Sequence, residues 1–484
     1  MLKALRHKRP GFGVALRHAA AVGCAVTLWS ATSTAITLKE AIGIALESNP
    51  EIGQAIENRE AIEFELRQAR GLYLPRVDLE GSYGARRLDS PDRRSIGRAD
   101  DTLRPGEIGT TVTWKLFDGF GREAEVERQA SRVDGASFRV LERSEFIALA
   151  IAKEYFEILL QMRILKIAED NLAFHQSIAG RISEGVRGGS LTAADSQQAQ
   201  ERLRAARARI VEAKEDLEAA RIKFFKLVAQ PATNLQAYRP LGAAVPPSVT
   251  AAVDHARANN PRIKFAQADV DAAAALVKAA HARFMPEVLL EGRARTGRDI
   301  DGTEDRTSDL QGRVVTRWNI FNGGIDKANH QEQLRRYGEE KMKLDAIRRE
   351  VDEAVRSAWN NRSKQGELRK VLQDQATLGR QVVDSYNEQF RAGRRTLLDV
   401  LSAQNTYTST RVLAETAEYA EAFAVYRILA ATGSLVHAMK LEHPAAAMAY
   451  ARSQARVPSP PEVDESRRYP PNRGNPWHPH VTKY

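Results

Sequence analysis

The side chains that could do chemistry in this chain are arginines and aspartates beside two glycine turns. The first turn contains Arg187, Gly188 and Gly189 and is followed by Asp195. The second contains Arg391, Gly393, Arg394 and Arg395 and is followed by Asp399. An arginine and an aspartate can form a charge-assisted pair. Alternatively, such residues cap helices and remain solvated. The elements that the turns connect therefore decide what these residues do.

Catalysis and metal chemistry find no support in the sequence. The ten histidines are scattered, and only His478 and His480 lie close together, in a proline-rich tail. The single cysteine, Cys24, excludes a disulfide framework and a cysteine-based metal site. No nucleophile stands beside a base, so we expect no enzyme, no metal and no cofactor. An exported hydrolase would need catalytic residues that this pattern does not supply.

Residues 1–35 have the pattern of a signal peptide. Five basic and no acidic residues flank a short apolar stretch, and Ser33-Thr34-Ala35 supplies the small residues of a cleavage site. Cleavage would remove Cys24 and five positive charges, which lowers the net charge from +10 to +5 and weakens the case for a nucleic-acid partner. The alternatives are a buried N-terminal helix and a lipoprotein site at Cys24.

The rest of the chain reads as a tandem repeat of about 200 residues. Asn49-Pro50, in the first helix, recurs as Asn260-Pro261 at an offset of 211 residues. Trp114-Lys-Leu-Phe-Asp-Gly119 recurs as Trp318-Asn-Ile-Phe-Asn-Gly323 at an offset of 204, which the glycine turns share. The first copy therefore has seven extra residues in the polar stretch 86–106, which we expect to be a loop. We predict repeats at 36–229 and 250–441, joined by a linker at 230–249.

Each repeat contains two segments in which apolar and polar residues alternate, as in β-strands with one apolar face. They lie at 76–84, 109–117, 287–295 and 312–321. A soluble hairpin would pack the apolar face on a core, whereas a transmembrane barrel would turn it toward lipid and line a lumen with the polar face. The segments are long enough to cross a bilayer. Trp114 and Trp318 fit an interfacial girdle.

The helices decide between these two interpretations. Segments 120–187 and 324–391 contain no proline and repeat apolar residues at steps of three and four, as coiled coils do. At 1.5 Å per residue each is about 100 Å long, so both must project from the sheet, and return helices follow at 190–229 and 395–435. Four strands cannot close a barrel, and open edges are excluded from lipid. A barrel therefore needs several chains: two would fill its interior, and three would leave a bore.

The Asn-Pro pairs, Leu74-Pro75 and Met285-Pro286, the Trp-x-(Leu/Ile)-Phe-(Asp/Asn)-Gly motifs and the turn motif at 391–404 resemble the TolC-type family of outer-membrane channels. The resemblance covers residues 36–441. It implies a mixed α+β membrane protein, a homotrimer in which a twelve-stranded transmembrane β-barrel continues into a twelve-helix periplasmic α-barrel. Each chain would give four strands and four main helices. The linker would lie in the family's equatorial collar, and the tail 450–484 is expected to be a disordered periplasmic segment.

The resemblance also implies a periplasmic gate at the turns. By position, Arg395 would pair with Asp195, and Asp399 would supply a ring of carboxylates that attracts cations. Ser402 stands where a second aspartate is expected, which would leave a single ring of carboxylates. Phe390 stands where a hydrogen-bonding tyrosine is expected, so the closed state would lack one hydrogen bond. The tips that would contact an adaptor are Arg187, Gly188, Gly189, Arg391, Gly393 and Arg394.

The resemblance, together with the strand and helix pattern, implies an exit duct in the outer membrane of a Gram-negative bacterium, extending into the periplasm. It would be a passive conduit in contact with outer-membrane lipid, opened by a docking periplasmic adaptor (membrane fusion) protein. An inner-membrane ABC or proton-driven transporter would supply the energy. The cargo would be a protein, by type I secretion, or a drug; the arginine-rich tip slightly favours type I secretion. The alternative is that the chain is itself a periplasmic coiled-coil adaptor.

Overall fold

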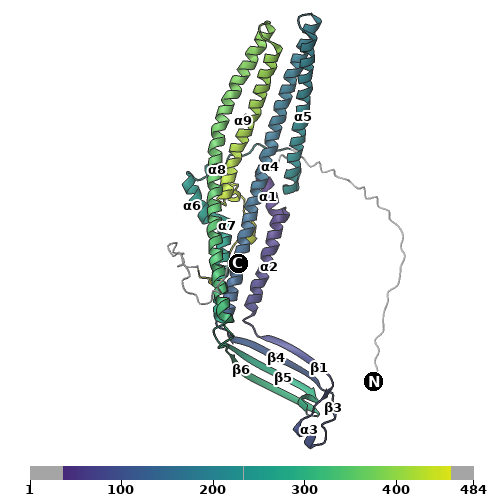
Figure 1. The fold of residues 1–484 in the computed structure, drawn as a ribbon, viewed down its shortest axis with the longest axis vertical. Helices are drawn as coiled ribbons and strands as arrows, with labels where there is room; N and C mark the ends of the chain where they lie inside the picture. Colours follow the sequence, from purple (N-terminus) through teal and green to yellow (C-terminus); the bar gives the residue numbers. More distant parts are fainter. Residues whose placement is uncertain (1–35, 233, 303, 459–484) are drawn as a thin grey trace, which may run out of the picture.

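The computed structural model describes residues 36–232, 234–302 and 304–458, so the expected signal peptide and the tail from 459 onward lie outside it. Figure 1 shows an elongated molecule with a β-sheet at one end and a layer of long helices extending from it. The fold is α+β and mostly helical. Among the described residues, no helix is both long and apolar enough to cross a membrane.

The elements follow the same order in the two repeats. The first repeat contains α1 (Leu38–Ser48), α2 (Pro50–Gly71), β1 (Arg76–Tyr83), β2 (Arg86–Arg87), α3 (Pro91–Ser95), β3 (Thr102–Leu103), β4 (Gly106–Phe117), α4 (Gly121–Arg187) and α5 (Ala193–Val228). After η1 (Gly242–Ala244) in the linker, the second contains α6 (Val249–Asn259), α7 (Pro261–Ala282), β5 (Glu287–Arg298), η2 (Ile300–Gly302), β6 (Arg306–Arg317), α8 (Ile325–Arg391) and α9 (Leu397–Ala431). The chain continues with α10 (Leu435–Ala438), η3 (Ala445–Ala447) and α11 (Ala451–Ala455).

Several expectations differ from the structure, in which the strands expected at 109–117 and 287–295 extend over Gly106–Phe117 and Glu287–Arg298. The last strand is Arg306–Arg317 rather than 312–321, because its ladder with β5 continues outward to the turn at 299–305, and Trp318 follows the strand. The stretch 86–106 is not a bare loop, since it contains α3 and the short β2–β3 hairpin. Residues 450–458, at the start of the expected disordered tail, are ordered, because α11 packs against α2 and α4.

The Asn-Pro pairs explain why two consecutive helices open each repeat. Proline fits the first turn of a helix but disfavours helix in the residue before it. Asn49 caps α2 by accepting the N–H of Glu51 at 2.9 Å, and its Nδ2 donates to the Leu227 carbonyl, at the end of α5, at 3.0 Å. Asn260 caps α7 and donates to the Ala431 carbonyl, at the end of α9, at 2.8 Å. The motif therefore ties the opening helices of each repeat to its return helix.

The long helices form a layer in the order α5, α4, α9, α8 (Figure 1). The inner helices α4 and α9 contact each other, and α5 and α8 form the edges. The main core lies where α1, α4, α5 and α9 meet. There the buried Tyr155 and Tyr426 donate their hydroxyls to the carbonyls of Gln236, at 2.6 Å, and Arg239, at 2.8 Å. The linker is thus bound to the middle of the helical layer.

None of the described residues forms a layer that covers the sheet. Its four antiparallel strands run in the order β1-β4-β5-β6 and project away from the helices (Figure 1). The register places on one face the exposed side chains of Val77, Leu79, Val112, Trp114, Leu290, Leu310 and Val314. Leu79 is 72% and Leu310 85% exposed, although sheets normally bury an apolar face. The outer sides of β1 and β6 also have unpaired backbone groups.

Buried carboxylates of α4 hold the segment that follows α9. Glu145 accepts the first two N–H groups of α10, at 2.9 and 3.2 Å. Asp134 accepts the first two N–H groups of α11, at 2.7 and 3.2 Å. Carboxyl oxygens satisfy the N–H groups that the first turn of a helix leaves without a partner inside the helix. Arg452 completes the contact by bridging Asp134, at 3.0 Å, and Asp271 of α7, at 2.5 Å. This C-terminal segment therefore joins elements of both repeats.

Candidate functional site

The two glycine turns at the far ends of the long helices have the same construction. Gly189 and Gly393 have φ angles of +72° and +70°, a left-handed conformation that glycine adopts without strain and that commonly ends helices. Thr192 and Thr396 then cap the return helices α5 and α9. The expected adaptor-contact residues are exposed here: Arg187, Gly188, Gly189, Arg391, Gly393 and Arg394.

Asp195 and Asp399 close capping boxes at these helix starts. Asp195 Oδ2 accepts the backbone N–H and the hydroxyl of Thr192 at 2.9 and 2.7 Å, and the Asp195 N–H donates back to Thr192 Oγ1 at 3.2 Å. Asp399 and Thr396 repeat this arrangement at 3.3, 2.8 and 3.3 Å. The bonds from Thr192 lower the pKa of the Asp195 carboxyl. Within one chain both aspartates therefore serve as helix caps, the alternative that the sequence left open.

Arg395 folds back onto its own hairpin. Its Nε donates to Gln389 Oε1 at 3.1 Å, and its guanidinium lies 4.0 Å from the ring centroid of Tyr386. Its Nη1 is 3.9 Å from Asp399 Oδ2. Within the described residues of a single chain, Arg395 forms no ion pair with Asp195.

Phe390 and Ser402 occupy different surroundings near the same turn. Phe390 packs against the apolar cluster between the two helical hairpins. Ser402 is exposed on α9. The structure therefore leaves Ser402 free to face a neighbouring molecule, whereas Phe390 contributes to packing inside the chain.

Contacts that the sequence analysis missed join the α4–α5 hairpin to the α8–α9 hairpin. They are the ion pair of Arg411 with Asp170 at 3.3 Å, the bond from Gln404 Nε2 to Asn171 Oδ1 at 3.0 Å and the bond from Arg181 Nη2 to Asn387 Oδ1 at 3.1 Å. The signal that could have found the first pair is its position in the repeat, because an acid and a base, Asp374 and Arg207, recur at the offset of 204.

The polar face of the sheet carries ion pairs between neighbouring strands. Lys115 pairs with Glu287 at 2.7 Å, Arg293 with Glu107 at 3.3 Å and Arg295 with Asp309 at 3.3 Å. On β6, Arg313 and Arg317 share one carboxylate, Glu291, at 2.7 and 2.9 Å. On β1, the exposed Glu80 has no ion-pair partner within the described residues. The β6 edge is thus rich in guanidinium groups, and the β1 edge has a spare carboxylate.

Trp114 and Trp318 lie where the sheet meets the helices. The Nε1 of Trp114 donates to the Tyr73 carbonyl at 2.9 Å, and the Nε1 of Trp318 donates to the Phe284 carbonyl at 3.1 Å. The two side chains remain 40% and 59% exposed. A satisfied indole N–H with an exposed ring is suited to a membrane–water interface.

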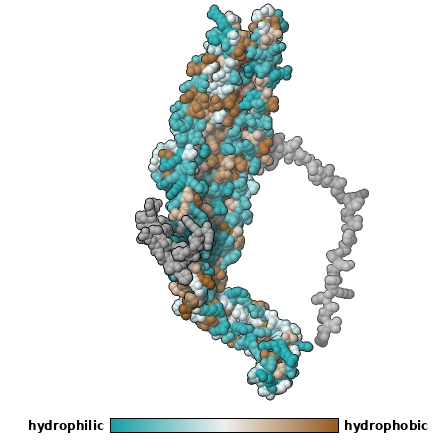
Figure 2. Space-filling model, viewed as in Figure 1, coloured by the Kyte–Doolittle hydropathy of each residue, from teal (hydrophilic) through white to brown (hydrophobic). Residues whose placement is uncertain are grey.

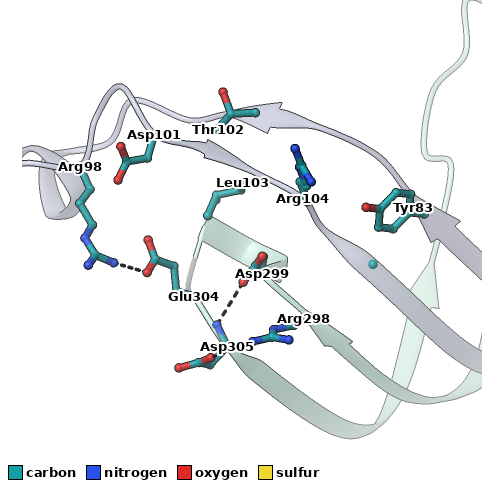
Figure 3. A pocket seen from close by; sticks show the side chains of 11 residues that line it. Tyr83, Arg98, Asp101, Thr102, Leu103, Arg104, Arg298, Asp299, Glu304 and Asp305 are labelled. Carbon is teal, nitrogen blue, oxygen red and sulfur yellow. Dashed lines mark hydrogen bonds and ion pairs between the residues drawn. The ribbon is translucent and has the colours of Figure 1, made fainter.

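An open hollow lies at the opposite end of the sheet, where the connection between β1 and β4 meets the β5–β6 turn (Figure 3). Arg98 and Glu304 point toward each other there and form an ion pair. The buried Arg93 donates to the Gly302 carbonyl at 3.2 Å. These contacts fix the two outer connections to each other, and the hollow lacks the enclosed apolar walls of a small-molecule site.

Burial perturbs two titrating groups where the C-terminal segment meets α4. It raises the pKa of Glu145 to about 7 and lowers the pKa of His443 to about 4. His443 Nε2 lies 3.5 Å from Glu145 Oε1. Both groups therefore favour their neutral forms. They lie where α4 contacts the segment that follows α9. In the part of the chain that the structure describes, no group of three His, Cys, Asp or Glu residues could hold a metal ion.

Comparison with a family model places most of this chain in one known family. The model described as "Outer membrane efflux protein" matches residues 41–230 and 252–434. The two matched ranges correspond closely to the two repeats and leave out the linker.

Individual proteins give the same result. The outer membrane efflux protein BepC of Brucella suis is 26% identical over 373 residues, which is 76% of this chain and 78% of BepC. The alkaline protease secretion protein AprF of Pseudomonas aeruginosa is 28% identical over 232 residues, 46% of this chain and 47% of AprF. The crystal structure of the outer membrane protein VceC of Vibrio cholerae superposes with a TM-score of 0.70 at 16% identity, over 84% of this chain and 97% of VceC. The last likeness shows a shared fold.

Proposed function

Because this chain belongs to the outer membrane efflux protein family, we propose that three copies assemble into a channel that carries cargo from the periplasm across the outer membrane. Twelve strands would form the transmembrane barrel, and twelve long helices would form the periplasmic tube.

The family assignment bears on the location of the protein and on the alternative functions. It agrees with the resemblance to TolC-type channels and with a location in the outer membrane of a Gram-negative bacterium, extending into the periplasm. BepC and AprF are named for efflux and secretion, not for catalysis. The alternative of a periplasmic adaptor finds no support in these relatives.

The observation that carries the proposal is the uncovered sheet. Its apolar face is exposed, its other face carries ion pairs, and the outer sides of β1 and β6 pair with no strand among the residues that the structure describes. In lipid every backbone group must be satisfied, and only closed barrels and helices achieve this. Pairing β6 of one chain with β1 of the next would close the edges, turn the apolar face to lipid and enclose the ion pairs in a bore.

The helical layer also has exposed apolar residues that a neighbouring chain would cover. On α4, Ile164 and Ile167 are 8% and 3% exposed. Their counterparts on α8 at the offset of 204 are Leu368 and Val371, which are 45% and 63% exposed. Figure 2 shows such apolar residues interspersed with polar ones over the visible face of the helices. A neighbouring chain would bury the α8 residues, as side chains of α5 and α9 pack around Ile164 inside the chain.

Exposed residues on the other edge helix fit the same scheme. Ile222 and Phe225 of α5 are 64% and 52% exposed, whereas their counterparts on α9, Tyr426 and Leu429, are 1% and 0% exposed. The edge helices α5 and α8 therefore carry the complementary halves of a contact that α9 and α4 make inside the chain. Three copies, rather than two, would leave a bore wide enough for cargo.

The gate at the periplasmic tips remains part of this proposal. In the assembled channel Arg395 would pair with Asp195 of a neighbouring hairpin, which requires it to leave Gln389 and Asp399. A ring of Asp399 carboxylates, with Ser402 and Phe390 nearby, would make the closed tip attractive to cations. Docking of an adaptor would offer the tips alternative partners and shift the population toward the open state.

The partners and the cargo follow from the family at the level of proposal. A periplasmic adaptor and an inner-membrane transporter, ABC-type or proton-driven, would complete the export system. AprF, which is named for protease secretion, supports a protein cargo, and BepC supports efflux.

Reconstitution in planar bilayers tests the proposal. We expect the detergent-extracted protein to migrate as a heat-modifiable trimer and to form pores. Arg395→Ala and Asp195→Ala should each raise the single-channel conductance, and Asp399→Asn should weaken block by multivalent cations. Recovery as a soluble periplasmic monomer that forms no pores would refute the channel. Unchanged conductance in the Arg395 and Asp195 variants would remove only the gate.

A further inference from the structure

The pairing of strands within the chain follows the repeat residue by residue. In the first repeat Arg76 of β1 lies opposite Thr113 of β4. Adding the offsets of 211 and 204 gives Glu287 and Arg317, which lie opposite each other on β5 and β6. The two hairpins therefore have the same register, and one can be used to infer the contacts of the other.

The contact between the two repeats offers a template for the contact between two chains. β4 ends the first hairpin and β5 begins the second, so the β4–β5 pair corresponds to β6 of one chain beside β1 of the next. On this seam Glu291 lies opposite Thr113, and Leu290 lies opposite Trp114. The same offsets convert these positions to Glu80 and Arg317, and to Leu79 and Trp318.

We propose that β6 of one copy pairs with β1 of a neighbouring copy with Arg317 opposite Glu80, which forms an ion pair between chains. This inference rests on the proposed assembly and adds its register. The two groups lie on the polar face of the sheet. The ion pairs between neighbouring strands of one chain lie on the same face.

The charges on the two edges are complementary in this register. Glu80 is exposed without an ion-pair partner in the described chain, and Arg317 shares Glu291 with Arg313. Opposite charges directly across two strands stabilise their pairing. On the other face, Leu79, which is 72% exposed, would cover the ring of Trp318, which is 59% exposed. Leu290 and Trp114 are paired in this way inside the chain.

The helical layer gives an independent ion pair by the same reasoning. Arg411 of α9 pairs with Asp170 of α4 at 3.3 Å inside the chain. At the offset of 204 these residues correspond to Arg207 of α5 and Asp374 of α8, which are exposed and have no ion-pair partner within the described residues. They lie on the two free edges of the layer, so they would meet between chains at the same seam.

Cysteine cross-linking tests the register, because the only native cysteine lies in the expected signal peptide. Directly opposite residues have Cα atoms about 4.5–5.5 Å apart, within the range that a disulfide bridges. The variant Glu80→Cys with Arg317→Cys should therefore yield covalent dimers and trimers after oxidation of the detergent-purified protein. The control, Glu80→Cys with Arg313→Cys, places the second thiol on the same face about 13 Å farther along the strand and should stay monomeric on a denaturing gel.

The possible results separate the register from the assembly. Cross-linking of the control in place of the Arg317 variant, in a protein that is trimeric in detergent, would overturn the register and leave the channel standing. A protein that is monomeric in detergent, with neither variant cross-linked, would overturn both.

Charge reversal gives a second test that needs no disulfide. Glu80→Arg and Arg317→Glu should each lower the temperature at which the trimer dissociates in detergent, and the double variant should recover most of the loss. No recovery in the double variant would contradict the ion pair.

Discussion

The helices α4 and α8 occupy the same position in the two repeats, yet their surroundings differ. Both contain 67 residues, end at a glycine turn and lie wholly within the described residues. In α4, 29 residues are buried, and in α8 only five are. Part of the difference comes from neighbours, because α4 has a helix on each side in the layer and α8 has one. Part comes from sequence, since Asp352 and Arg356 of α8 stand where α4 buries Ala148 and Ala152. The apolar residues that α8 nevertheless exposes, such as Leu368 and Val371, indicate a missing neighbour.

The shorter helices also differ in burial, but here the helix of the second repeat is the more buried one. α2 and α7 each have 22 residues, but α2 has three buried residues and α7 has ten. The second repeat also lacks the buried acids of α4, since Asp134 and Glu145 correspond to Gly338 and Arg349. The acids therefore serve a task that has no counterpart on α8, namely holding the C-terminal segment.

The largest effect should distinguish a buried position on α4 from its counterpart on α8. Ile167→Asp would place a carboxylate in a site that is 3% exposed, which costs several kcal/mol, so the folded protein should not accumulate. Val371→Asp, at the corresponding exposed site, should leave a folded chain that does not form trimers. Circular dichroism and size-exclusion chromatography in detergent measure both outcomes. Equal loss of folding in the two variants would contradict the comparison.

The next effect concerns the C-terminal segment. Arg452→Ala would leave Asp134 and Asp271 buried without their cation, and breaking such a pair costs about 3–5 kcal/mol. We expect a lower thermal unfolding midpoint and faster proteolysis near residue 450. The control Gln454→Ala removes an exposed bond to Arg70 and should change the midpoint little. Similar behaviour of the two variants would show that the segment is not held by these acids.

A smaller effect should depend on pH. Burial raises the pKa of Glu145 from 4.5 to about 7, so the folded state keeps a proton that the unfolded state has lost, and the free energy of unfolding falls as pH rises from about 4.5 to 7. His443, whose pKa burial lowers to about 4, contributes the opposite slope and masks this fall in the native protein. Glu145→Gln removes only the first contribution.

The difference between the two proteins isolates Glu145. The stability of the Glu145→Gln variant relative to the native protein should therefore increase over this pH range, by about 2–3 kcal/mol, in denaturant titrations. Arg349→Gln, the matched change on α8, should show no such trend. A constant difference between the Glu145→Gln variant and the native protein at every pH would refute the assignment.

The smallest effect should be equal in the two repeats. Thr192→Ala and Thr396→Ala each remove the N-cap of a return helix, which costs about 1 kcal/mol. Because the two turns have the same construction, their thermal midpoints should fall by similar amounts. A large effect at only one turn would show that the repeats differ at the tips as well as along the helices.

Sequence periodicity accounts for much of the fold but not for this contrast. The long helices were expected at 120–187 and 324–391, and the structure has them at Gly121–Arg187 and Ile325–Arg391. Composition shows that α8 is the more polar helix, but periodicity does not say what covers its remaining apolar residues, so the exposure of Leu368 and Val371 could not be predicted.

The order at the start of the tail also could not be predicted from the sequence. Its proline-rich composition suggested disorder, whereas Asp134, more than 300 residues earlier, fixes the start of α11. The capping role of Asp195 and Asp399 is predictable from the sequence, because Thr-x-x-Asp is a local pattern.

The most direct test of the account asks whether the contact between α4 and α9 recurs between chains. Arg207→Cys with Asp374→Cys places one thiol on each free edge of the helical layer, in a chain whose only native cysteine lies in the expected signal peptide. After treatment with a bis-maleimide long enough to span the length of an arginine–aspartate pair, we expect covalent dimers and trimers on a denaturing gel, with no larger species, because three chains close the ring. Monomers alone, or a ladder that extends beyond trimers, would contradict it.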